Sequence, residues 1–176
     1  VIGRRAVPLM VCRGHEVTGV GRSPDRLKTL EQAGATPLVL DLFDREAVRR
    51  SIAGFDAIVN LATHIPPLGL KSFFASAWKE TGRIREHGSA LLVDEALSSG
   101  AQLFVQESFA PICPDSGDRW ITEETRPQAA PYNEATLKAE ASADRFSKDG
   151  GRGVVLRFAY FYGPGDGFTQ ETFKYV

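Results

Sequence analysis

The sequence is poor in cysteine and has no excess of either charge. It has only two cysteines, Cys12 and Cys113, among 176 residues, and its formal net charge is −1. The two cysteines do not have the spacing of metal ligands. A balanced charge provides no basic surface for nucleic acid or for an anionic membrane. We therefore expect a reduced, cytoplasmic protein that binds neither nucleic acids nor membranes.

Long hydrophobic runs and internal repeats are also missing. The apolar runs are short and broken by charges, which does not predict a transmembrane helix. The three histidines, His15, His64 and His87, lie in different predicted elements, and no pair has metal-ligand spacing, so we predict no metal site. What is present is an ordinary globular composition, 43% hydrophobic and 24% charged, that suits one domain with a sizeable core.

Apolar runs that predict strands alternate with segments that predict helices. We expect strands near residues 16–20, 36–40, 57–61, 103–106 and 154–158, and helices near 2–13, 24–33, 44–52, 75–99 and 135–147. This alternation predicts a Rossmann-like α/β fold: a doubly wound parallel sheet between two layers of helices, formed by residues 1–176 as one domain.

Several residues with useful chemistry follow or end these predicted strands. They are Arg22, Asp41, Ala62, Ser108 and Tyr162. Ligands of doubly wound sheets bind beyond the carboxyl ends of the strands. We therefore expect a binding site along this edge of the sheet.

The same edge carries a series of short motifs. In chain order they are Gly21-Arg22-Ser23, Asp41-Leu42, Asn60-Leu61-Ala62-Thr63, Pro131-Tyr132, and Arg157 followed by Tyr162-Gly163-Pro164-Gly165. As an ordered set they resemble the extended short-chain dehydrogenase/reductase family, the NAD(P)-dependent epimerase/dehydratase group. The resemblance covers nearly the whole chain and implies a nicotinamide dinucleotide site. Family members begin with a strand and a glycine-rich turn and end in a substrate-binding part, so we expect this chain to be a fragment that lacks both.

The resemblance assigns the phosphate groups of the dinucleotide to three residues. Gly3 matches the last glycine of the family's phosphate-binding turn, although it could simply begin a helix. Arg22 and Ser23 follow the strand at 16–20, where an acidic residue holds the 2′-hydroxyl of NAD and an arginine pairs with the 2′-phosphate of NADP. We therefore expect NADP to be preferred over NAD.

Two further motifs are implied to contact the rest of the cofactor. Asp41 and Leu42 match the pair that holds the adenine edge, with Asp44 as the better candidate for capping the next helix. The turn formed by Leu61, Ala62 and Thr63 matches the small-residue turn that lets the backbone pass under the cofactor.

The catalytic positions depart from the family pattern. The family's acid/base tyrosine corresponds to Tyr132, but the lysine that lowers its pKa and holds the cofactor ribose is replaced by Thr136. Phe109 stands at the serine position, with Ser108 beside it, and Arg85 stands at an asparagine position. We predict Tyr132 as the proton-transfer residue and Ser108 as its partner. Glu107 and His64 are the next candidates, whereas Lys138 lies on a different face of the helix and cannot replace the lysine.

These observations leave two classes of function open. One is an NAD(P)-dependent oxidoreductase, epimerase or dehydratase that acts on a carbonyl or alcohol of a small, sugar-like substrate. The other is a non-catalytic dinucleotide-binding module or redox sensor that has lost the lysine and the serine, and a partial gene product without stable function is a third reading. The helices at 75–99 and 132–147 resemble the family's dimer face and imply a homodimer.

Overall fold

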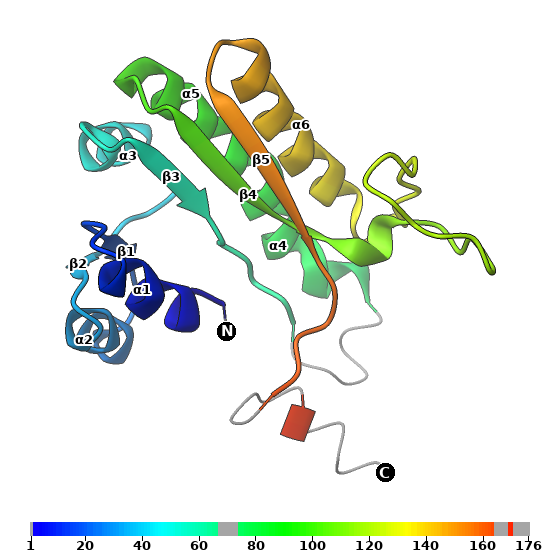
Figure 1. Cartoon of the computed structure of the whole chain (residues 1–176), viewed down its shortest axis with the longest axis horizontal. Helices are drawn as coiled ribbons and strands as arrows, with labels where there is room; N and C mark the ends of the chain where they lie inside the picture. The colour runs from blue at the N-terminus through cyan, green and yellow to red at the C-terminus, as the bar shows by residue number, and fades with distance from the viewer. Residues whose placement is uncertain (1, 67–73, 164–168, 171–176) are drawn as a thin grey trace. The chain divides into compact units, whose positions relative to one another are not determined.

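The structure is a computed structural model that describes residues 2–66, 74–163 and 169–170 (Figure 1). The chain divides into two compact units, Val1–Ser51 and Ile52–Val176, and each is described by itself. Both units are built from parallel strands joined by helices, so the predicted Rossmann-like class with parallel pairing is confirmed.

The first unit contains a parallel pair of short strands and the helices that connect them. Its elements are α1 (Ile2–Cys12), β1 (Thr18–Val20), α2 (Pro24–Gln32), β2 (Thr36–Leu38) and α3 (Arg45–Ile52), whose last residue opens the second unit. Thr18 lies opposite Thr36 in the ladder. A Cβ at Gly19 would lie 2.4 Å from the Leu30 side chain, so the missing side chain lets α2 pack directly on β1.

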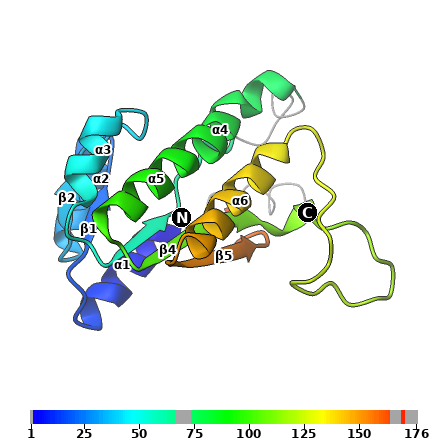
Figure 2. The ribbon, with the colours of Figure 1, turned by 90° about the horizontal axis from the view of Figure 1, so that it is seen from above.

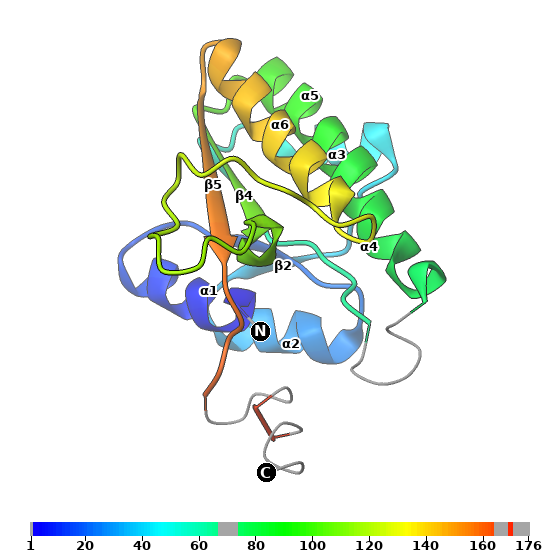
Figure 3. The ribbon, with the colours of Figure 1, turned by 90° about the vertical axis from the view of Figure 1, so that its right-hand side faces the viewer.

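The second unit contains a three-stranded parallel sheet in the order β3-β4-β5. Its elements are β3 (Ala57–Asn60), η2 (Ala75–Trp78), α4 (Lys79–Arg83), η3 (Ile84–Gly88), α5 (Ser89–Ser99), β4 (Leu103–Phe109), η4 (Ala110–Ile112), α6 (Glu134–Lys148) and β5 (Arg152–Phe158). Helices α5 and α6 cover the same face of this sheet (Figures 2 and 3). Two successive right-handed crossovers that add strands in the same direction produce this arrangement.

The helix predicted at 75–99 is a continuous helical run with a change of winding. A π-helical turn at Ile84–Gly88 separates α4 from α5, and the run ends at Gly100, which has a left-handed φ of 80°. π-turns in α-helices often occur at functional sites. The turn here carries Arg85, whose side chain is buried.

Helix α6 lies very close to β5. A Cβ at Gly153 would lie 2.0 Å from the carbonyl oxygen of Ala143, so only glycine allows this approach of helix and strand. Phe146 of α6 packs against Phe104 of β4, with ring centroids 5.7 Å apart and both side chains fully buried. These contacts fix α6, the helix that follows Tyr132 and carries Thr136.

All five predicted strands are present, but their limits differ from the prediction. Strand β4 continues to Phe109, so Ser108 lies within the strand and not after it. Among the described residues the strands form two sheets, one in each unit. Residues Pro164 and Gly165 of the last predicted motif lie outside the described residues. In the part of the chain that the structure describes, no helix has both the length and the apolar character needed to cross a membrane.

Candidate functional site

The carboxyl end of β3 is held by a buried amide network. Asn60, only 4% exposed, lies opposite Gln106 of β4 and donates from Nδ2 to Gln106 Oε1 over 3.0 Å and to Ser89 Oγ over 3.1 Å. Its Oδ1 accepts a hydrogen bond from the backbone N–H of Ala62 over 3.2 Å. Asn60 therefore fixes the turn through Leu61, Ala62 and Thr63, which the sequence assigned to the cofactor.

Tyr132 lies two residues before the first residue of α6 and is accessible. Its side chain is 42% exposed, and its ring packs against Trp78, with centroids 5.1 Å apart at 54°. Trp78 thus holds the Tyr132 ring on one side, and the rest of the side chain stays accessible to solvent, as an acid/base residue requires.

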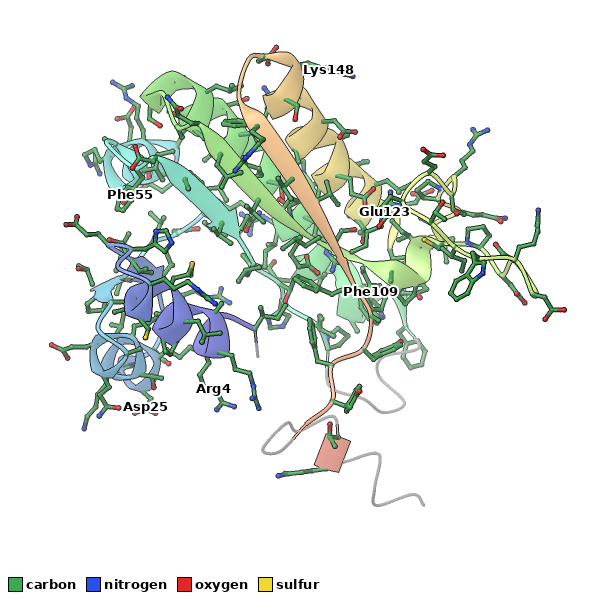
Figure 4. The ribbon with its side chains drawn as sticks, viewed as in Figure 1. Arg4, Asp25, Phe55, Phe109, Glu123 and Lys148 are labelled. Atoms are coloured by element: carbon green, nitrogen blue, oxygen red, sulfur yellow. The ribbon has the colours of Figure 1, made fainter. Side chains whose placement is uncertain are left out.

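One turn after Tyr132, Thr136 is fully buried and contacts a cation. The Arg85 Nη1 donates to Thr136 Oγ1 over 2.9 Å. The same guanidinium donates from Nη2 and Nε to the two carboxylate oxygens of Glu107, over 2.5 and 3.3 Å. It also lies 6.0 Å from the ring centroid of Phe109, which is labelled at the carboxyl end of β4 in Figure 4. A cation therefore lies beside the position of the family's lysine, but it belongs to another element.

Ser108 is also buried, and its hydroxyl has a partner. Ser108 Oγ donates to Glu140 Oε1 of α6 over 2.5 Å. Arg157 of β5, which is opposite Ser108 in the ladder, donates to both oxygens of Glu140 over 2.8 Å each. The hydrogen bonds from Arg157 to Glu140 raise the pKa of this guanidinium above its ordinary value, against a smaller opposing effect of burial. Among the described residues no hydrogen bond joins Ser108 to Tyr132.

Asn133 is a polar side chain that lacks any polar contact. It is 1% exposed, and neither its Oδ1 nor its Nδ2 has a hydrogen-bond partner among the described residues. Buried amides are rarely left unpaired in proteins, so Asn133 is an exception among the buried polar side chains of the described residues. Sequence reasoning missed this residue because an asparagine before a helix is common as a cap.

In the first unit, the predicted cofactor residues lie in three places. Arg22 and Ser23 follow β1 directly; Arg22 is exposed, and Ser23 begins α2 with an extended backbone but without a side-chain capping bond. Asp41 Oδ1 accepts from the N–H of Phe43 over 2.9 Å, so its carboxylate holds its own turn, and Leu42 next to it is half-buried.

The two remaining predictions in this unit concern a glycine and a helix cap. Asp44 Oδ1 accepts from the N–H of Ala47 over 3.0 Å, as expected of the cap of α3. Gly3 lies in the first turn of α1, and a Cβ there would meet nothing within 4 Å. Space therefore does not require a glycine at this position.

The two other catalytic candidates differ in access. Glu107 is buried against Arg85. His64 is exposed, and its backbone carbonyl accepts a hydrogen bond from the hydroxyl of Thr81. Of the two, only the His64 side chain is open to solvent.

Comparison with known proteins identifies the family. The model of a family described as NAD(P)H-binding matches residues 1–148. The chain belongs to this NAD(P)H-binding family. The predicted likeness to the extended short-chain dehydrogenases/reductases is thereby confirmed, since solved structures with this fold include epimerases and dehydratases of that group.

Two curated relatives and one solved structure illustrate the likeness. A 3-diazoavenalumate denitrifying reductase from a Streptomyces species is 29% identical over 97% of this chain and 56% of its own length. A 3-beta-hydroxysteroid dehydrogenase from Mycolicibacterium neoaurum is 25% identical over 99% of this chain and 48% of its own. The UDP-glucose 4-epimerase of Thermotoga maritima has a TM-score of 0.76 at 21% identity, covering 93% of this chain and 54% of the epimerase. The chain thus spans about half the length of the relatives it matches.

Proposed function

We propose that this chain binds NADP(H) and supports hydride transfer between the nicotinamide and a carbonyl or alcohol of a small molecule, with Tyr132 as the proton-transfer residue. The observation that carries the proposal is the accessible Tyr132 ring at the start of α6, in a member of an NAD(P)H-binding family. Membership in the family supports a nicotinamide dinucleotide, and the choice of NADP rests on Arg22.

The residues of the site are suited to the dinucleotide. The exposed Arg22 guanidinium has no hydrogen bond or ion pair to the described residues, so it is free to pair with a 2′-phosphate, with the hydroxyl of Ser23 beside it. Gly3, Asp41 and Leu42 are the further contacts proposed in the first unit. In the second unit the turn of Leu61, Ala62 and Thr63 is held in place by Asn60.

When bound, the dinucleotide supplies or accepts the hydride. The chain's own residues bind it, orient the substrate and move one proton at the Tyr132 phenolic oxygen. The Ser108 hydroxyl already donates its proton to Glu140. Ser108 is therefore proposed to support the site through this contact, and the proton transfer is assigned to Tyr132.

The substrate class is proposed only broadly. The two curated relatives are named for a diazo compound and a steroid, whereas the solved epimerase and dehydratase are named for nucleotide sugars. A sugar-like substrate is the proposal from the sequence, and a hydroxysteroid-like alcohol is the alternative that the name of one curated relative supports.

A second function, a dinucleotide-binding module without turnover, is favoured by one observation. The position four residues after Tyr132 holds an uncharged threonine, and the nearby Arg85 is paired with Glu107. Titration of the chain with NADPH and NADH, followed by nicotinamide fluorescence, tests both functions. Tight binding with no NADPH oxidation across sugar-nucleotide, steroid and aromatic carbonyls favours the module, and no binding of either dinucleotide refutes both.

A further inference from the structure

Aromatic side chains gather at the carboxyl end of the sheet in the second unit. Tyr132 packs against Trp78, with ring centroids 5.1 Å apart. Phe109, the last residue of β4, lies opposite Phe158 of β5 in the ladder, and the Phe158 ring packs against Phe161, also at 5.1 Å. We call these five residues the aromatic cluster.

The two parts of the cluster are joined through one arginine. The Arg85 guanidinium donates to Thr136, four residues after Tyr132, and lies 6.0 Å from the centroid of the Phe109 ring. Arg85 comes seven residues after Trp78 in the same continuous helical run, which is about two turns, so both lie on one side of that run. The Phe109 ring is therefore a near neighbour of the segment that carries Tyr132.

Part of the aromatic cluster is open to solvent. The side chains of Tyr132 and Phe161 are 42% and 40% exposed, and Phe109 is half-buried. A single exposed apolar side chain is ordinary, whereas neighbouring exposed rings beside a proton-transfer residue indicate a surface that binds a ligand.

Polar side chains close to these rings bond to one another. Arg85 is paired with Glu107, and Ser108 and Arg157 both donate to Glu140. A sugar carries a hydroxyl on most of its carbons, and each hydroxyl loses hydrogen bonds to water unless the site supplies a partner. The rings offer carbon surface, which suits a ligand with few polar groups.

We propose that the aromatic cluster binds a substrate whose carbonyl or alcohol is attached to a flat aromatic ring, and that Phe109 selects for that ring. This inference rests on the proposed function for the role of Tyr132, and it narrows the substrate class. Two aromatic rings attract each other in offset or edge-on arrangements, an attraction that a saturated ring of the same size lacks. The Tyr132 hydroxyl then meets the oxygen of the substrate, and the Phe109 ring meets its aromatic part.

A matched pair of ketones measures the preference. 2-Acetylnaphthalene and its fully saturated analogue 2-acetyldecalin have the same carbonyl group and the same carbon skeleton, and neither can be reduced when the dinucleotide present is NADP⁺. Ligand-detected NMR titration should show that the unmodified chain binds the aromatic ketone about threefold to tenfold more tightly than the saturated one. Equal binding of the two ketones, tighter binding of the saturated ketone or of UDP-glucose, or no binding of the aromatic ketone overturns the aromatic substrate class.

Variants of Phe109 locate the preference. Phe109→Leu keeps an apolar side chain without the ring, so the ratio of the two ketone affinities should fall to about one, whereas Phe109→Tyr keeps the ring and should keep the ratio. Phe55→Leu is the control, because Phe55 lies just before the amino end of β3 (Figure 4), and it should leave the ratio unchanged. An unchanged ratio in Phe109→Leu overturns the role of Phe109. If Phe109→Leu does not fold, Phe161→Leu makes the same test of the cluster.

Failure of this inference and failure of the proposed function give different results. A chain that binds NADPH but not the aromatic ketone keeps the proposed function and loses the aromatic substrate. A chain that does not bind NADPH loses the proposed function, whereas the ratio of the ketone affinities, measured without the dinucleotide, still decides whether the aromatic cluster prefers an aromatic ring.

Discussion

Arg157 and Glu140 form a bidentate ion pair that joins β5 to α6. The distances from Nε to Oε1 and from Nη2 to Oε2 are 2.8 Å each. The Glu140 side chain is 10% exposed and also accepts the Ser108 hydroxyl bond, so three elements of the second unit meet at one carboxylate. Removing one partner of an ion pair with this geometry and burial is far more costly than removing one partner of a surface pair, because it leaves a charge with little water around it.

We predict that Arg157→Ala lowers the free energy of unfolding by about 3 kcal/mol, since it leaves Glu140 uncompensated. Lys138→Ala is the matched control, because it removes an exposed pair between Lys138 and Glu86, whose side chains are 56% and 38% exposed. Urea denaturation followed by circular dichroism measures both. Equal losses in the two variants would show that the Arg157–Glu140 pair has no special role.

A second prediction concerns pH. The hydrogen bond from Lys138 lowers the pKa of Glu86 below its usual 4.5, and this effect exceeds the opposing effect of burial. A carboxylate with a lowered folded pKa stabilises the fold above its unfolded pKa, and this contribution is lost as pH falls through the folded pKa.

The unmodified chain should therefore have a higher free energy of unfolding than Lys138→Ala by a constant amount above pH 4.5. This difference should vanish as the pH falls below 4.5 and Glu86 is protonated. Arg157 behaves differently, because its pKa is raised above its ordinary value and its contribution is lost only in strongly alkaline solution. Unfolding curves at a series of acidic pH values check the first trend. A Lys138→Ala difference that grows on acidification would contradict it.

The sequence predicted the strand and helix order because the apolar runs are local features. It ended this strand at 106, before Glu107 and Ser108, since polar residues in a row usually end a strand, whereas Gln106, Glu107 and Ser108 all lie inside β4. They stay in the strand because each has a buried partner far away in sequence, namely Asn60, Arg85 and Glu140 respectively. Such long-range pairs leave only a weak signal in the local sequence, because all that it shows is a polar or charged residue within a strand that is otherwise apolar.

The same reason explains what the sequence could and could not say of the site. Tyr132 was found by its motif, and the structure places it at an accessible position. Arg85 was noted only as a departure from an asparagine, and its contact with Thr136 required the fold. Ser108 was expected near the substrate, yet its full burial follows from the extension of β4 to Phe109.

Cofactor preference provides a third prediction. Arg22→Ala should weaken NADPH binding by about 1.5–3 kcal/mol, the contribution of hydrogen bonds to a charged group, and leave NADH binding nearly unchanged. Arg26→Ala, another exposed arginine in the same unit, is the control and should change neither. Calorimetric titration with both dinucleotides gives the four affinities. If NADPH and NADH bind Arg22→Ala and the unmodified chain with the same ratio, Arg22 does not recognise the 2′-phosphate.

The last prediction concerns Tyr132. Tyr132→Phe removes only the phenolic oxygen, so the ring should keep its contact with Trp78 and the variant should keep its stability and NADPH affinity. Turnover on a confirmed substrate should fall at least about a hundredfold, the usual contribution of a positioned acid or base. NADPH oxidation followed by absorbance measures the rate, with Tyr160→Phe as a control at another exposed tyrosine.

Full activity of Tyr132→Phe would remove Tyr132 from the mechanism and direct attention to His64. His64 is the better of the two remaining candidates because its side chain is exposed, whereas the Glu107 carboxylate is buried and already bound to Arg85. A proton carrier must reach the substrate, and a carboxylate held in a buried ion pair cannot do so without breaking that pair. His64→Gln should then reduce the rate where Tyr132→Phe does not.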